Sequence, residues 1–132
     1  MKYTKNYKYR LEEDLTLLTN VFITKAVQTD WIGLSVKGEL YINKGYAWDG
    51  SPGPVIDTDN SMMASCAHDA LYQLMRKKFL PESYRRKCNL LYYDLCEEAG
   101  MYWARRKLQY FSVAEFAESS ASPKDSRIIS EV

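Results

Sequence analysis

The chain has 132 residues, of which 46% are hydrophobic, so it can form one domain with one core and is too apolar to be disordered. Eighteen basic and seventeen acidic side chains give a formal net charge of +1, without the basic excess typical of nucleic-acid-binding proteins. We therefore expect a globular protein that has no nucleic-acid partner.

In the first half, alternating or β-branched and aromatic residues predict strands. Lys37-Gly38 has the composition of a tight hairpin turn between two of them. We expect one small antiparallel sheet with one face on the core, followed by a structured Gly- and Pro-rich loop over 43–57. The predicted strands are Tyr7–Leu11, Asn20–Thr24, Trp31–Val36 and Glu39–Ile42.

The second half predicts three helices. The first begins at Asp59 or Asn60 and runs to about Lys78, and the second has Pro81 in its first turn. Gly100 is a plausible stop for the second helix, because glycine favours the position after a helix end. The inward-facing residues expected on the first helix are Ala64, Ala67, Leu71, Leu74 and Met75.

The third helix begins at about Met101 and ends between Phe111 and Phe116, with Ala104, Leu108 and Phe111 facing inward. Together these elements predict an α+β fold, in which a small antiparallel sheet in the N-terminal half packs against about three helices in the C-terminal half. We expect a single domain over 1–118 and a flexible polar tail over 119–132.

Three cysteines, Cys66, Cys88 and Cys96, form no CxxC pair, so a zinc ribbon or redox motif is not indicated. Cys88 and Cys96 would lie about 12 Å apart along one helix, too far for a disulfide. Reduced, mostly buried thiols in a cytoplasmic protein are the simplest expectation. No apolar segment resembles a signal peptide or a membrane span, so we expect no secretion and no membrane partner.

His68, the only histidine, lies on the apolar side of the first predicted helix and is followed by Asp69. A histidine that faces a core must hydrogen-bond through its ring, and Asp49 in the preceding loop is the expected partner. In one interpretation this pair is a structural hydrogen bond that ties the loop to the helix, and we call this role an internal brace. In the other, His68 and the two carboxylates form a site, either as a general base with an orienting aspartate or as ligands of a divalent metal. The metal is not favoured, because one histidine and few carboxylates make a thin ligand set.

Three motifs follow one another in the chain: Gly45-x-x-x-Asp49-Gly50-Ser51, Ala67-His68-Asp69-x-Leu71-Tyr72 and Arg85-x-x-Cys88-Asn89, with a glycine at 100. In this order they resemble a small bacteriophage and prophage family, known as domain of unknown function 1353, over about residues 30–115. The family pattern implies a polar cluster at the matching positions. Where the family has an aspartate in its second helix, this chain has Asn89, which weakens a metal site because hard cations favour charged oxygens.

From the residues and the resemblance together we take two groups of candidate site residues. The catalytic candidates are Asp49, His68 and Asp69. The binding candidates are Trp48, Ser51, Tyr72, Arg85 and Asn89.

The resemblance implies a phage-encoded accessory protein of the host cytoplasm or the virion. Our leading hypothesis is a binding or structural component that contacts a phage or host protein through exposed aromatic side chains, with the His/Asp cluster as a brace. The first alternative is a small hydrolase directed at cell-wall material, with or without a metal, that uses Asp49, His68 and Asp69. The second alternative is an inhibitor of a host defence protein.

Overall fold

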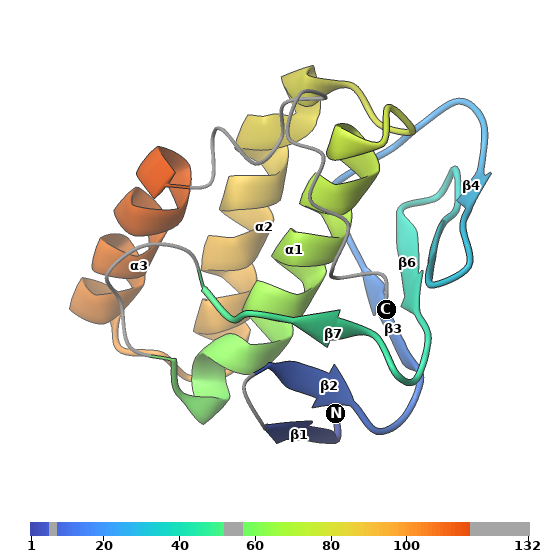
Figure 1. The fold of residues 1–132 in the computed structure, drawn as a ribbon. Helices are drawn as coiled ribbons and strands as arrows, with labels where there is room; N and C mark the ends of the chain where they lie inside the picture. Colours follow the sequence, from blue (N-terminus) through green and yellow to red (C-terminus); the bar gives the residue numbers. More distant parts are fainter. Residues whose placement is uncertain (6–7, 52–56, 117–132) are drawn as a thin grey trace. The chain divides into compact units, whose positions relative to one another are not determined.

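The structure, a computed structural model, describes residues 1–5, 8–51 and 57–116 and has the α+β fold expected from the sequence (Figure 1). The N-terminal half contains two small antiparallel sheets, where the sequence predicts one, and the C-terminal half contains three α-helices. The chain divides into two compact units: residues 1–49 form the first, and the helices belong to the second. The predicted tail over 119–132 lies outside the described residues.

The first sheet has the strand order β1-β2-β7, and neighbouring strands are antiparallel. Tyr9 lies opposite Trp48 across the β2–β7 pair, and the rings of Tyr3, Tyr9 and Trp48 pack with centroids 5.5 to 6.2 Å apart. Such aromatic cross-strand contacts stabilise strands that are too short to be stable through backbone pairing alone. The strands are β1 (Tyr3–Lys5), β2 (Tyr9–Leu11) and β7 (Ala47–Trp48).

The second sheet has the order β3-β6-β5-β4 and confirms the predicted hairpin. The β5–β6 turn places Gly38 at φ +84, a conformation that glycine adopts without a steric penalty. Ile42 lies opposite both Leu15 and Ile32, so one face of the sheet is continuously apolar and buried. The strands are β3 (Leu15–Leu18), β4 (Val27–Gln28), β5 (Ile32–Leu34) and β6 (Glu39–Ile42).

The predicted strand Asn20–Thr24 is wrong, and the strand of this region is β3, which precedes it. Val21 is fully buried, but its amide donates to the Thr19 side chain rather than to a neighbouring strand. The β-branched composition of this segment therefore reflects the burial of its side chains. It does not indicate strand pairing, because pairing depends on the tertiary context.

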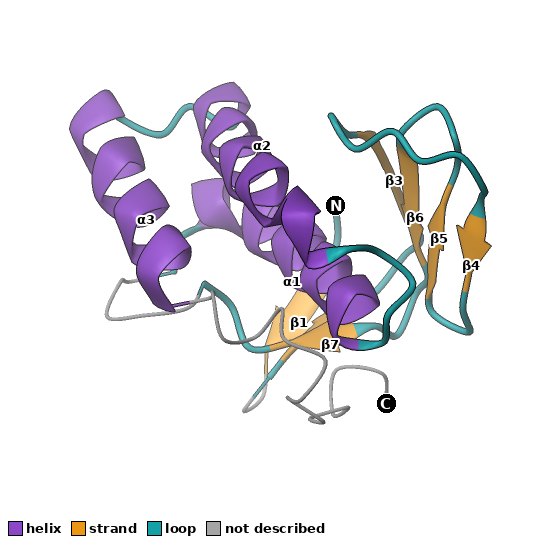
Figure 2. Cartoon of the chain, turned by 90° about the horizontal axis from the view of Figure 1, so that it is seen from above, coloured by secondary structure: helices purple, strands orange, loops and turns teal. Residues whose placement is uncertain are grey.

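In the second unit α1 packs on α2 and α2 on α3, as Figure 2 shows from above. The two short 3₁₀ turns η1 and η2 precede α1 and α2, so the α-helices begin a few residues later than the sequence predicts. The second helix ends as expected, with Gly100 at φ +88. The elements are η1 (Asp59–Ser61), α1 (Met62–Arg76), η2 (Glu82–Tyr84), α2 (Arg85–Glu98) and α3 (Trp103–Phe116).

Helices α1 and α2 end with the same pair of backbone hydrogen bonds. After α2, the Gly100 amide donates to the Glu97 carbonyl and the Met101 amide to the Cys96 carbonyl, which satisfies two of the last carbonyl groups. After α1 the same two bonds form, but the left-handed position is occupied by Lys78, at φ +67. A lysine is strained in this conformation and a glycine is not.

The predicted inward face of α3 is wrong. Leu108 and Phe111 are 64% and 65% exposed, and Ala104 is exposed as well. Gln109, Ser112 and Val113 are the buried residues instead. The helix is therefore turned so that polar side chains face the second unit's interior and large apolar ones face solvent.

Candidate functional site

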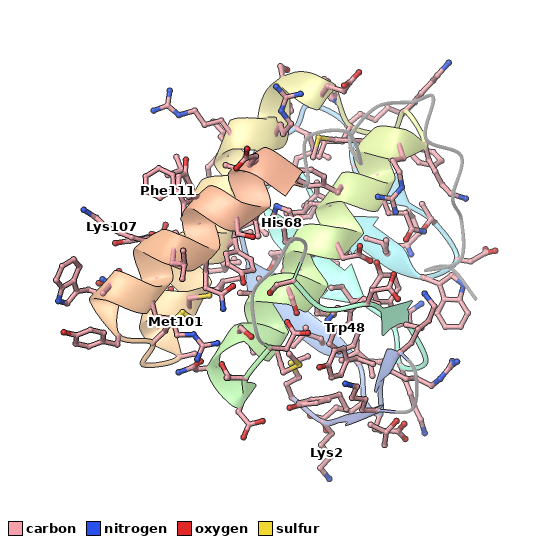
Figure 3. All side chains as sticks on the ribbon, turned by 60° about the vertical axis from the view of Figure 1, so that its left-hand side comes forward. Lys2, Trp48, His68, Met101, Lys107 and Phe111 are labelled. Carbon is pink, nitrogen blue, oxygen red and sulfur yellow. The ribbon has the colours of Figure 1, made fainter. Side chains whose placement is uncertain are left out.

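His68 of α1, labelled in Figure 3, is buried, with 3% of its surface exposed. Its hydrogen-bond partner is Asn89 of α2. The His68 Nε2 atom lies 2.7 Å from the Asn89 Oδ1 atom, and the Tyr72 hydroxyl donates to the same oxygen at 2.7 Å. An amide oxygen only accepts hydrogen bonds, so the Nε2 atom must carry the proton. The histidine is thus a neutral Nε2–H tautomer that donates to an amide.

The environment of His68 keeps it neutral. Its ring stacks on Tyr72, one helical turn further along α1, with centroids 4.2 Å apart. Burial lowers the pKa of His68 to about 4, and the hydrogen bond with Asn89 opposes this only in part. Since the charged form is disfavoured in an apolar interior, the imidazole carries no charge at neutral pH.

Tyr92 forms a second set of hydrogen bonds, and its ring contacts His68 of the first set. The edge of this ring contacts the His68 ring, with centroids 5.6 Å apart at 77°. The Tyr92 hydroxyl donates to Gln109 Oε1 of α3 at 3.0 Å and lies 2.6 Å from Ser51 Oγ, which must then be the donor. Burial raises the pKa of Tyr92 well above its usual value, so this hydroxyl stays protonated.

These six side chains form what we call the buried polar cluster. They connect all three helices with the loop that precedes α1, and every one of them except Ser51 is buried. Four were candidates from sequence. Two were missed: Tyr92, which lies three residues after Asn89 on the same face of α2, and Gln109, because α3 was expected to face the other way. The members are Ser51, His68, Tyr72, Asn89, Tyr92 and Gln109.

Asp49, the partner expected for His68, belongs to the first compact unit, and its pairing with His68 stays a prediction. Its carboxylate forms an ion pair with the Lys8 ammonium at 2.9 Å, and its side chain is 67% exposed. A carboxylate that stays in water avoids a desolvation penalty of several kcal/mol, whereas a neutral amide such as Asn89 can be buried against an imidazole at much lower cost. Trp48, also a binding candidate, is fully buried against Tyr3 and Tyr9.

Of the two remaining candidates, Asp69 lies in the middle of α1 and Arg85 at the start of α2. Asp69 is half-buried, and its charge adds to the effect of burial in raising the pKa of Cys66. Arg85 is the half-buried first residue of α2. The roles proposed for both residues stay predictions.

The chemistry of the cluster is that of a structural hydrogen-bond network. A general base needs a reachable ring nitrogen and a pKa near the working pH, and His68 is buried with a pKa of about 4. Among residues 1–5, 8–51 and 57–116, no three His, Cys, Asp or Glu side chains gather as metal ligands would. The three cysteines are free and buried, as expected, and burial raises the pKa of the Cys88 thiol to about 12.

The exposed side of α3 is the second notable feature of this unit. Trp103 is 56% exposed, and together with Leu108 and Phe111 it places three large apolar groups on one side of the helix. Figure 3 shows Lys107 and Phe111 pointing away from the other helices. We call this surface the outer face of α3, and it consists of Trp103, Lys107, Leu108, Phe111 and Glu115.

No family model, no curated protein and no solved structure matches the chain. The resemblance to the phage family therefore stays a prediction. None of the described helices combines the length and the apolar character that crossing a membrane requires.

Proposed function

We propose that the chain is a phage-encoded accessory protein that works by binding another protein chain through the outer face of α3, with the buried polar cluster as its internal brace. One observation carries the proposal: α3 places Gln109 and Ser112 inward and leaves Trp103, Leu108 and Phe111 in water. Contiguous exposed apolar groups on a small protein are typical of protein-binding surfaces.

The orientation of α3 follows from the brace. Turning the helix to bury Phe111 would withdraw Gln109 from the Tyr92 hydroxyl and leave two buried polar groups without each other. Each such group costs about 1–3 kcal/mol when it is left unsatisfied in an interior. Burying one apolar side chain gains about 1.5–3 kcal/mol, so the loss of two satisfied polar groups is comparable with what burial of Leu108 and Phe111 would gain, and it opposes turning the helix. A partner supplies the burial that the fold itself does not.

The hydrolase alternative receives no support from the same geometry. His68 donates to an amide rather than to a carboxylate, and the Asp49 carboxylate bonds Lys8 in the other unit. Neither of these two contacts is the carboxylate–histidine hydrogen bond that would orient a general base.

Site-specific photo-crosslinking tests the proposed function. Benzoylphenylalanine replaces Phe111 in the full chain, and in a matched control it replaces Phe79, an exposed phenylalanine 49% accessible in the turn after α1. We expect a discrete protein adduct from position 111 in cells that produce the chain, and loss of this adduct when Leu108→Ser is added. Equal labelling from both positions, or no adduct from position 111, would contradict the proposal.

A further inference from the structure

We infer that the occupant of the outer face of α3 is a second copy of this chain, in an antiparallel helix pair centred on Phe111. The inference rests on the proposed function, because it requires that this face binds protein. It adds the identity of the partner, the direction of pairing and the residues that set the register.

The charges on the outer face are arranged for self-pairing. Lys107 and Glu115 are both exposed and lie four residues before and after Phe111, so all three side chains share one side of the helix. When two copies cross antiparallel at Phe111, Lys107 of each lies opposite Glu115 of the other, and two ion pairs form. A parallel pair would instead place Lys107 against Lys107 and Glu115 against Glu115. The surface is therefore complementary to itself in one direction only, as a twofold interface requires.

The apolar groups on the face fit the same pairing. In this register Leu108 lies opposite Ala114 of the second copy, a large side chain against a small one, and the small Ala104 leaves room for a close approach. Lys107 covers Trp103, with its ammonium 5.8 Å from the ring centroid, so its aliphatic stem continues the apolar surface.

The size of the surface predicts a weak dimer. Trp103 and Phe111 each expose more than half of their surface, which amounts to roughly 100 Å² or more per ring. With Leu108 and the stem of Lys107, a few hundred Å² per copy would be buried, less than the roughly 1,000 Å² in total that stable interfaces exceed and in the range of weak, transient contacts. The net charge of +1 opposes association of two copies very little. We expect a dissociation constant in the micromolar range.

Charge reversal with sedimentation equilibrium tests the inference on the full chain. Wild type should pass from monomer to dimer between about 1 μM and 1 mM. Lys107→Glu alone places glutamate against Glu115, and Glu115→Lys alone places lysine against Lys107, so each variant should self-associate at least about tenfold more weakly. Mixing the two single variants restores both ion pairs, and we expect a heterodimer of about wild-type affinity. Both positions are exposed, so thermal unfolding should confirm intact folds.

Three outcomes would overturn the inference. Wild type that is monomeric over the whole range contradicts pairing, although the proposed function survives if position 111 still crosslinks to a different protein. Single variants that weaken association without recovery on mixing contradict the antiparallel register. Binding to anionic phospholipid vesicles by a chain that stays monomeric would assign the face to a lipid surface, and would also contradict the proposed function if no protein adduct forms.

Discussion

Helices α1 and α3 belong to the same compact unit but are held in opposite ways. Twelve of the fifteen residues of α1 are buried, so this helix is stabilised by apolar contacts around most of its circumference. α3 buries one side only, and that side carries Gln109 and Ser112 beside Val113. The comparison shows that a polar anchor can determine which face of a helix remains in water, and this is what makes the outer face of α3 available to a partner.

The largest effect on stability is expected at Asn89, the residue of the buried polar cluster that joins α2 to α1. Asn89→Ala removes the oxygen that both His68 and Tyr72 use, and leaves two buried donors without it. We expect a loss of about 2–5 kcal/mol in the free energy of unfolding, measured by urea denaturation. Leu90→Ala, at the next residue of α2, which is 39% exposed, is the matched control and should cost less than Asn89→Ala, about 1 kcal/mol. Similar costs for the two variants would show that the cluster contributes little.

The neutral state of His68 predicts an acid-dependent loss of stability. The folded pKa of about 4 lies below the unfolded value of 6.5, so on acidification the unfolded chain takes up a proton before the folded chain does. The contribution is complete above pH 6.5 and is lost as pH falls toward 4, by about 3 kcal/mol in total. Chemical denaturation at a series of pH values measures this slope. His68→Leu should remove that part of the slope, and an unchanged slope would contradict a buried neutral imidazole.

Substitutions at two neighbouring positions of α3 compare the stability contributions of its buried and exposed faces. Gln109→Ala deletes the acceptor of the Tyr92 hydroxyl and should cost about 1–3 kcal/mol. Leu108→Ala, one residue earlier and 64% exposed, should cost about 0.5 kcal/mol or less at a concentration where the chain is monomeric. The opposite order of costs would mean that the apolar side of α3 faces the interior.

The smallest effects are expected at the helix ends. Lys78→Gly should stabilise the protein by about 0.5–1 kcal/mol, because it relieves a left-handed lysine. Gly100→Ala should destabilise it by about 1 kcal/mol, and only through the backbone, since a β-carbon there would meet no atom within 4 Å. Thermal unfolding measures both changes, and equal responses at the two sites would contradict this explanation.

The sequence predicts what local chemistry determines. The hairpin at Gly38, the helix stop at Gly100 and the inward residues of α1 are confirmed, since turn conformation and apolar periodicity decide them. The periodicity of α3 fails because Leu108 has the right spacing for a core, while the hydrogen bond that orients the helix joins Gln109 to a residue of α2. Long-range polar pairing of this kind leaves no pattern in the local sequence.

The candidate site shows the same limit. His68, Tyr72 and Asn89 do come together, because spacing placed two of them on one face of α1 and the third on the next helix. Charge suggested Asp49 as the partner of His68, whereas the hydrogen bond that the structure shows joins His68 to the neutral amide of Asn89. The cost of burying a charge favours an amide at such a position, and this cost depends on the folded structure.

The accessibility of α3 tests the central claim most directly. Phe111→Cys and Gln109→Cys each add one thiol to a chain whose own three cysteines are buried. At a concentration below that of pairing, a thiol reagent such as dithionitrobenzoate should modify Cys at position 111 at nearly the rate of a free thiol and leave position 109 protected in the folded protein. Protection at 111 together with rapid reaction at 109 would contradict the outward orientation of the apolar face.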